Sequence, residues 1–207
     1  MSSFRFYKVK NKSRQFDAPA YYHVFNRGVA KQKIFVDTKD KHKFIELMER
    51  YLLNESEAVR GDGLSYTVHP VKVVAYCLMG NHFHLLLFQD KDPGDISRFM
   101  KELTTAYSMY FNLRHRRKGP VFEGMFQAVH VMGDSHFDHL TRYIHLNPRT
   151  YRTYRWSSLP EYLGRRSTSW VCKELAMDMT PSEYSQFMEG YTDRAEELKK
   201  IKSELDL

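Results

Sequence analysis

Two strongly apolar runs are separated by only two residues, Gly80-Asn81, and this arrangement constrains the fold more than any other feature of the sequence. Residues 71–79 and 82–88 are rich in β-branched, aromatic and leucine side chains, which is typical of β-strands. A Gly-Asn pair between such runs is a common hairpin signal. The two runs are therefore predicted to pair antiparallel, and the apolar character of residues 71–79 predicts a central strand.

The remaining segments alternate between the spacing of strands and that of helices. Apolar residues recur every three or four positions after Asp37, and Pro148 stops the last helix. The order strand, helix, strand, strand, helix, strand, helix predicts an α+β fold, a ferredoxin-like or RRM-like antiparallel sheet with helices packed on one face, plus a helical C-terminal extension. The further elements are a strand at 21–26, a helix that starts at Asp37, a helix at 95–114, a strand at 126–132 and a helix at 134–147.

Charge divides the 207 residues into two unequal parts. Residues 174–207 hold nine acids and four Lys or Arg, so they carry −5, whereas residues 1–173 carry +12. The basic part is the candidate binder of a polyanion. We expect a basic N-terminal arm at 1–19, one domain at 20–165 and an acidic helical extension at 166–207.

Two cysteines without metal-type spacing predict no disulfide framework and are typical of a cytoplasmic protein. No apolar run approaches the roughly 20 residues that a membrane span needs, so we expect no membrane partner.

His82 and His84 are two residues apart on a predicted strand, which directs both imidazoles to the same face. Such a pair could bind one metal ion. The spacing alone leaves open that these are two half-exposed strand histidines.

Tyr143 and Asn147 are four residues apart on the last predicted helix and therefore share a face. A tyrosine can attack a phosphodiester and retain the bond energy as a phosphotyrosine, while an amide oxygen can help to hold a metal ion. The structural alternatives are packing for Tyr143 and a helix C-terminal residue before Pro148 for Asn147.

Four motifs stand in order along residues 20–165. The motifs are Tyr22-His23-Val24-Phe25-Asn26-Arg27-Gly28, Met79-Gly80-Asn81-His82-Phe83-His84-Leu85, Gly119-Pro120-Val121-Phe122-Glu123-Gly124 and Arg142-Tyr143-Ile144-His145-Leu146-Asn147-Pro148. With these motifs in this order, the chain closely resembles the single-tyrosine HUH transposases, in the branch associated with repetitive extragenic palindromes.

The resemblance implies that His82 and His84 are metal ligands and that Tyr143 is the nucleophile. Asn147 would be the third ligand, where related insertion-sequence transposases have glutamine, and the ion would be Mg²⁺ or Mn²⁺. Cleavage would leave a 5′-phosphotyrosine and a free 3′-hydroxyl on hairpin-flanked single-stranded DNA. Met125 stands where we expect a basic residue, and residues 180–207 lie outside the resemblance.

Clusters of arginine and lysine are the candidate DNA contacts. Tyr154 and Trp156, which follow the proposed nucleophile helix, could stack on bases or pack inside the domain. The aromatic and basic arm at residues 4–14 could follow a DNA backbone or be a disordered tail. The candidate cations are Arg27, Arg114, Arg116, Arg117, Lys118, Arg149, Arg152 and Arg155.

The leading hypothesis is therefore a metal-dependent DNA transposase, or strand-transferase. A domesticated hairpin-DNA-binding protein with little catalytic activity is the alternative, and a metallonuclease that uses water is a third possibility. Two chains could also form a homodimer, and the sequence leaves open whether they would share an active site.

Overall fold

The computed structural model describes residues 16–52, 67–131, 134–176, 178–190, 195–196 and 198–199. The expected arm at residues 4–14 and the polar Gly-Asp-Gly stretch at 61–63 lie outside these ranges.

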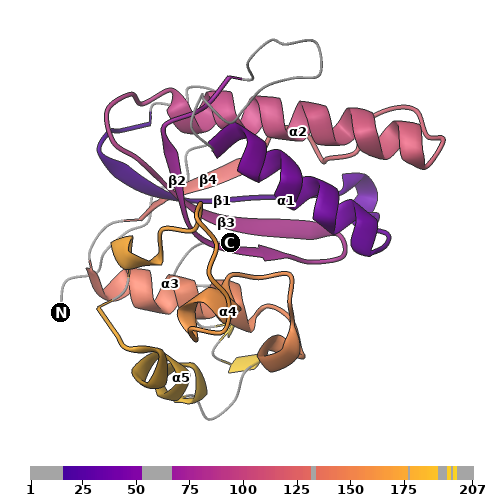
Figure 1. The fold of residues 1–207 in the computed structure, drawn as a ribbon. Coiled ribbons are helices and arrows are strands. Elements are labelled where there is room, and N and C mark those ends of the chain that lie inside the picture. Colours follow the sequence, from indigo (N-terminus) through magenta and orange to yellow (C-terminus); the bar gives the residue numbers. More distant parts are fainter. Residues whose placement is uncertain are drawn as a thin grey trace.

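Four strands form one antiparallel sheet in the order β2-β3-β1-β4 (Figure 1). This is the strand order of a ferredoxin-like sheet, so the predicted fold class is confirmed. Gly80-Asn81 forms the predicted tight connection, in which the Met79 amide donates to the His82 carbonyl over 2.9 Å. The strands are β1 (Ala20–Arg27), β2 (Val71–Leu78), β3 (His82–Gln89) and β4 (Gln127–Val131).

Helices α1 (Thr38–Leu52) and α2 (Asp95–Arg114) pack side by side on one face of the sheet (Figure 1). Their apolar residues recur at helical spacing, so each helix turns one stripe to the sheet. The largest buried side chains of this core are aromatic: Tyr22, Tyr76, Tyr107, Phe44, Phe83, Phe99 and Phe111.

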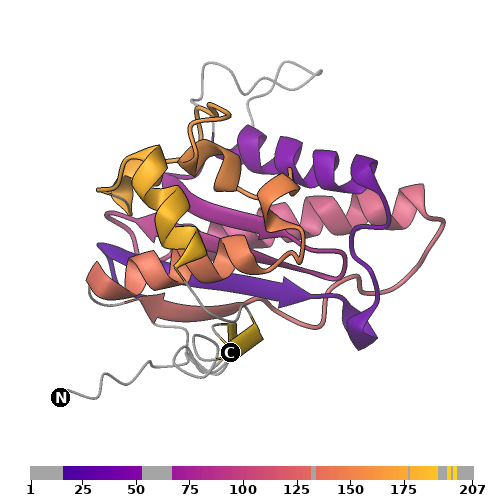
Figure 2. The same cartoon turned by 90° about the horizontal axis from the view of Figure 1, so that it is seen from below.

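The opposite face of the sheet is covered by the C-terminal half of the chain. Helix α3 (Asp134–Leu146) lies across the strands, and α4 (Leu159–Tyr162) and α5 (Pro181–Glu189) lie beside it (Figures 1 and 2). Sequence patterns predicted α3 and a helical C-terminal extension but not α4, and the expectation that the helices pack on one face only was wrong, because α3 covers the second face. Three short 3₁₀ turns complete the described structure: η1 (Val29–Lys31), η2 (Tyr151–Thr153) and η3 (Lys173–Leu175).

Strand β2 lies at the edge of the sheet, so the prediction of a central strand at residues 71–79 was wrong. Later parts of the chain pair with its outer edge: the Leu78 amide donates to the Trp156 carbonyl and the Cys172 amide to the Val73 carbonyl, each over 2.9 Å. Because both faces and the edge are covered, the strand is as apolar as a central one.

Cys77 and Cys172 are both free, as expected for a chain without a disulfide framework. Within the described ranges, none of the helices combines the length and the apolar character that crossing a membrane would require. The predicted cytoplasmic location stays a prediction.

Candidate active site

The two histidines of β3 lie on the sheet face that α3 covers. Side chains alternate along a strand, so His82 and His84 share this face while Phe83 points to the α1/α2 core. The rings of the two histidines are 5.0 Å apart between centroids. Their partners on the neighbouring strand β1 are Arg27 opposite His82 and Phe25 opposite His84.

Tyr143 reaches this histidine pair from α3, within one chain. Its ring centroid lies 5.5 Å from that of His84, and only 7% of the residue is exposed. Burial raises the pKa of Tyr143 above its ordinary value, and a hydrogen bond with the Asn147 side chain offsets part of this rise. The phenol is therefore protonated near neutral pH, and an adjacent cation would be needed to favour the phenolate.

Asn147 follows the last residue of α3 and faces His82. The Asn147 Oδ1 atom is 3.3 Å from His82 Nε2, and its amide Nδ2 lies 3.5 Å from the Tyr143 carbonyl one turn earlier. The structure therefore brings all three candidate ligands and the candidate nucleophile to one place, as the sequence analysis expected.

Asn81 orients the first of the two imidazoles. Its Nδ2 donates to the Lys31 carbonyl over 3.3 Å, which leaves its Oδ1 to accept from His82 Nδ1 over 2.7 Å. With the proton on Nδ1, the lone pair of a neutral His82 is on Nε2, the atom that faces the Asn147 oxygen. A side-chain partner of this kind is common behind metal-binding histidines.

This donor set fits a divalent cation. Two acceptors, His82 Nε2 and Asn147 Oδ1, face each other, and a cation or a proton between them would relieve their repulsion. Within the described part of the chain, no three His, Cys, Asp or Glu side chains gather as a metal site, and the third candidate ligand beside the two histidines is the amide oxygen of Asn147. The amide oxygen and the sites left for water suit Mn²⁺ or Mg²⁺, although the two imidazoles would also accept Zn²⁺.

A cleft of about 600 Å³ opens over these groups and could admit a nucleotide phosphate. Its wall combines the histidine pair and Tyr143 with two cations at the rim. The lining residues are Phe25, Asn26, Arg27, Lys31, Asn81, His82, Phe83, His84, Glu123, Gln127 and Tyr143.

His23 on β1 is a member of the site to which the sequence analysis gave no role. It is fully buried, and its Nε2 lies 2.9 Å from His84 Nδ1. Burial lowers the pKa of His23 to about 3, so its ring is neutral. The alternation of β1 against β3 could have indicated this position, but only with the strand register known.

The rim of the cleft carries an ion pair between Arg27 and Glu123, both partly exposed. The Glu123 carboxylate accepts two hydrogen bonds from the guanidinium, so the charge of this candidate DNA contact is already balanced. Sequence analysis assigned no role to Glu123. Met125, at the position where a basic residue was expected, is 56% exposed.

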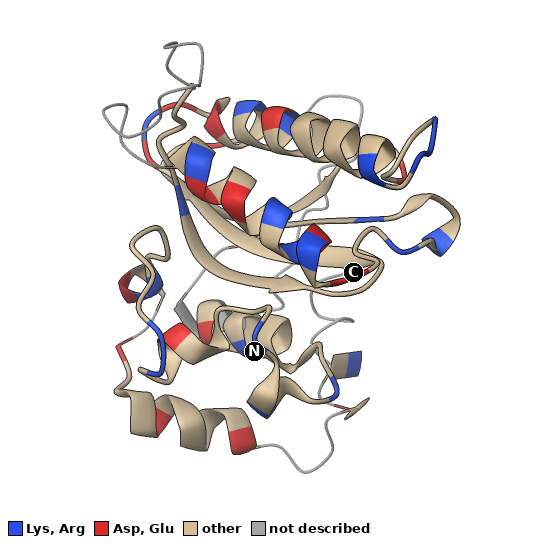
Figure 3. Cartoon of the chain, turned by 45° about the vertical axis from the view of Figure 1, so that its right-hand side comes forward, with Lys and Arg blue, Asp and Glu red and all other residues tan. Residues whose placement is uncertain are grey.

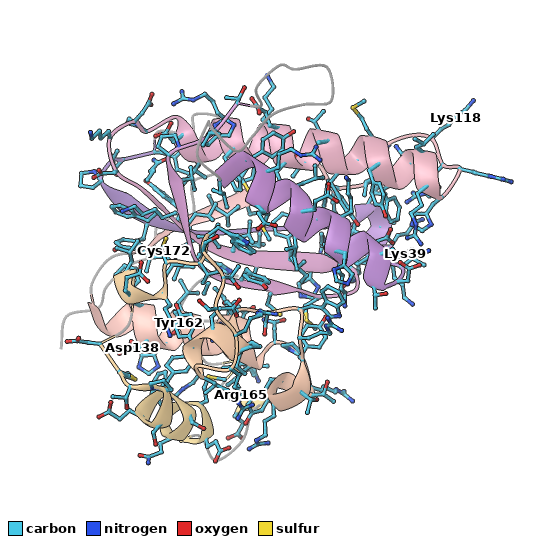
Figure 4. The ribbon with its side chains drawn as sticks, in the orientation of Figure 1. Lys39, Lys118, Asp138, Tyr162, Arg165 and Cys172 are labelled. Atoms are coloured by element: carbon cyan, nitrogen blue, oxygen red, sulfur yellow. The ribbon has the colours of Figure 1, made fainter. Side chains whose placement is uncertain are left out.

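The basic cluster at the end of α2 is divided between structural and exposed side chains. Arg114 pairs with Asp37 and with the buried carboxylate of Asp40. In contrast, Arg116 and Lys118 are exposed, and Lys118 points away from the body of the protein (Figure 4). Figure 3 shows positive residues on the loop after α2 and on the loop after β1, on the same side of the domain.

The segment after α3 presents cations without the aromatic surfaces that were expected as one alternative. Arg149 and Arg155 are exposed, and Arg152 pairs with Glu189 over 3.2 Å. Trp156 is only 7% exposed, and the Tyr154 hydroxyl donates to a backbone carbonyl of β2. The packing alternative therefore holds for both rings.

Helix α3 is anchored to the C-terminal segment on its other side. His145 lies within hydrogen-bonding distance of the Tyr184 hydroxyl, at 2.7 Å, and of Ser158 Oγ, at 2.8 Å. Arg142 donates to the Phe187 carbonyl over 2.5 Å. These contacts hold the helix that carries Tyr143 against the sheet.

Comparison with known proteins supports the resemblance to a transposase family. Residues 66–147, which include β2, the histidine pair, Tyr143 and Asn147, match the family model described as IS200-like transposase. None of the curated proteins matches the chain. A solved structure described as a REP-associated tyrosine transposase bound to a REP hairpin has the same fold, with a TM-score of 0.55 and 12% sequence identity, and the match covers 79% of this chain and 97% of that one. The family resemblance seen in the sequence is confirmed.

Proposed function

We propose that this chain, with its IS200-like transposase segment, cleaves and rejoins single-stranded DNA through a covalent bond to Tyr143. The observation that carries the proposal is the 5.5 Å separation between the rings of Tyr143 and His84, inside one cleft of a single chain. A nucleophile so close to a pair of imidazoles is in place to attack a phosphate held there.

The reaction exchanges one phosphodiester for another. The Tyr143 oxygen forms a bond to phosphorus while the bond from phosphorus to the 3′ oxygen breaks. The phenol loses its proton, and the departing 3′ oxygen gains one and becomes a hydroxyl. The DNA downstream of the cut stays on the protein as a 5′-phosphotyrosine, and attack by a 3′-hydroxyl on this bond rejoins a strand without ATP.

The residues around Tyr143 prepare this exchange. His82, His84 and Asn147 would hold Mg²⁺ or Mn²⁺, which would supply positive charge to the scissile phosphate and to the phenolate. Asn81 keeps the His82 lone pair directed at the site through its 2.7 Å hydrogen bond. Tyr143 and His84 are buried, at 7% and 6% exposed, which limits access by water and favours strand transfer over hydrolysis.

We further propose that the substrate is hairpin-flanked single-stranded DNA. The net charge of +7 and the cations at the cleft rim and after α3 support binding of a polyanion. The related structure named above holds a REP hairpin, which supports the same class of ligand for this chain. Because Tyr143 and the histidines meet within one chain, the proposal does not require a shared active site.

The direct test mixes the protein with a labelled hairpin oligonucleotide and Mg²⁺ or Mn²⁺ and separates the products under denaturing conditions. A 3′-end label should migrate with the protein and a 5′-end label should leave as free DNA. Tyr143→Phe should abolish the adduct, whereas Tyr110→Phe, on α2 at the other face of the sheet, should form it as the parent protein does.

Each alternative has its own outcome in this assay. Specific hairpin binding without cleavage under either ion would indicate a domesticated binding protein. Nicked DNA with no covalent adduct would indicate a hydrolytic metallonuclease. Equal adduct formation by Tyr143→Phe and the parent would show that Tyr143 is not the nucleophile.

A further inference from the structure

The imidazole of His23 lies directly behind His84, on the side away from the cleft. His23 belongs to the central strand β1, between β3 and β4, and 0% of the residue is exposed. Its Nε2 atom is 2.9 Å from His84 Nδ1, a distance at which one nitrogen must donate and the other accept. His84, in turn, lines the cleft.

Only one proton can lie between these two nitrogen atoms, so one of them donates and the other accepts. If His23 donates, a neutral His84 carries its proton on Nε2, and that nitrogen cannot offer a lone pair to an ion. If a neutral His84 donates from Nδ1, its Nε2 carries a lone pair. The direction of the hydrogen bond between His23 and His84 therefore determines whether His84 Nε2 has a lone pair to offer to an ion.

The partner of His84 differs from the partner of His82. His23 can either donate to His84 or accept from it, because its proton can be on either ring nitrogen. Nδ1 of His23 has no hydrogen-bond partner among the residues that the structure describes. When His84 donates to His23, this buried Nδ1 carries the remaining proton of His23. By contrast, Asn81 can only accept at the oxygen that contacts His82, so the tautomer of His82 is fixed.

We propose that His23 is a positioning residue that accepts the Nδ1 proton of His84 and so turns the Nε2 lone pair of His84 toward the cleft. This inference rests on the proposed function, because the ion that His84 would bind is part of that proposal. His23 itself contacts neither the ion nor the DNA. Its contribution is to select one of the two neutral forms of a ligand, a role that partners behind metal-binding histidines commonly fulfil.

A purely structural role makes a different prediction. His23 contacts the aromatic rings of Phe25 and Tyr143 at centroid distances of 5.1 and 6.0 Å, so an apolar residue of similar size could fill the same space. If His23 only packed, leucine would serve as well as glutamine. If it accepts a proton from His84, glutamine, whose Oε1 can reach the position of Nε2, should serve better than leucine.

The first measurement is the nitrogen-15 NMR spectrum of the histidine rings in the full-length, metal-free protein at neutral pH, assigned with His84→Gln. His84 should be protonated on Nδ1 in the parent protein and in His23→Gln, and should lose this preference in His23→Leu. Protonation of His84 on Nε2 in the parent protein would overturn the inference. This measurement does not depend on whether the protein binds metal.

The second measurement is Mn²⁺ affinity by calorimetry for the same variants, with the folded state checked by thermal unfolding. His23→Leu should bind Mn²⁺ about 10–100-fold more weakly than the parent protein, the usual effect of losing such a partner, while His23→Gln should stay within a few-fold. Equal affinity of the leucine variant and the parent would overturn the inference.

The two measurements together separate this inference from the proposed function. If the parent protein bound neither Mn²⁺ nor Mg²⁺ but His84 was protonated on Nδ1 only when residue 23 could accept, the tautomer role would stand and the metal site would fail. If the leucine variant did not fold, the parent spectrum and the glutamine variant would still decide the question.

Discussion

The two faces of the sheet bury different kinds of side chain. Between the sheet and α1 and α2, the largest buried groups are aromatic rings, and Phe44 alone contacts the rings of Phe35, Phe83 and Tyr107. On the α3 side, three imidazoles are buried, those of His23, His84 and His145. A buried polar group costs free energy unless it is paired; both ring nitrogens of His145 have partners, whereas Nδ1 of His23 has none among the described residues.

This difference indicates that the two faces of the sheet have different roles, one in supporting the fold and one in forming the site. The α1/α2 face provides a closely packed, mainly aromatic support for β1 and β3, although it also buries Asp40 and His69. The α3 face holds polar groups at fixed distances from one another, which is what a site for a charged reaction requires. Mutations on the two faces should therefore separate stability from activity.

Phe44→Ala should have the largest effect on stability. Phe44 is fully buried at the centre of the α1/α2 face, and truncating such a ring typically costs about 3–5 kcal/mol of unfolding free energy. Urea unfolding followed by circular dichroism measures this loss. Folded Phe44→Ala should still form the DNA adduct.

Tyr143→Phe, on the α3 face, is the change to compare with Phe44→Ala on the α1/α2 face. It removes one hydroxyl from a residue that is 7% exposed, so we expect a loss within about 1 kcal/mol together with the loss of the adduct. A destabilisation by Tyr143→Phe as large as that of Phe44→Ala would contradict the division between the two faces.

Arg114→Leu should destabilise the protein next most strongly. The guanidinium bridges Asp37 and the buried Asp40, so leucine leaves a buried carboxylate with fewer charged partners. Loss of a charged hydrogen bond of this kind costs about 1.5–3 kcal/mol. Thermal unfolding compares this variant with Arg116→Leu, whose exposed side chain should change stability little; equal losses would mean that the Arg114 bridge does not stabilise the fold.

Acid should weaken the α3 side through His145. Burial lowers the pKa of His145 to about 3, below the 6.5 of a solvated histidine, so the unfolded chain binds the extra proton between these two values. Above pH 6.5 His145 is neutral in both the folded and the unfolded chain. As the pH falls from 6.5 toward 3, the unfolding free energy decreases by up to about 1.4 kcal/mol per pH unit. Urea unfolding between pH 7 and pH 4 measures this slope.

His145→Gln should reduce the acid dependence because glutamine does not titrate. His139→Gln, at an exposed histidine on the same helix, is the matched control. If both variants had the slope of the parent protein, His145 would not be the group that acid charges.

Much of the fold could be predicted because local patterns and tertiary structure agree. The helix predicted at residues 95–114 has the bounds of α2, and Gly80-Asn81 makes the expected hairpin. The edge position of β2 could not be predicted, because its outer side is covered by residues 156–158 and 171–172, about 80–100 positions later. A register shift between Val73 and Ala75 also has no signal in the sequence.

The site was predictable where its residues follow a short spacing and not where it depends on register. His82 and His84, and likewise Tyr143 and Asn147, are related by the period of one strand or one helix. His23 joins them only because β1 pairs with β3. The charge balance of Arg27 by Glu123, 96 residues later, is also a consequence of tertiary structure.

The smallest expected effect distinguishes two cations of the same basic cluster. Lys118 is exposed at the end of its loop, whereas Arg114 is bound to two carboxylates. If Lys118 contacts one phosphate of a single strand, Lys118→Gln should lower the slope of log affinity against log salt concentration by about 0.7. Arg114→Gln should leave this slope unchanged, because its charge is already balanced within the protein. Fluorescence anisotropy with a labelled hairpin oligonucleotide from 50 to 200 mM salt measures both slopes. A larger change in slope for Arg114→Gln than for Lys118→Gln would show that DNA displaces the two carboxylates and that Arg114 contacts DNA.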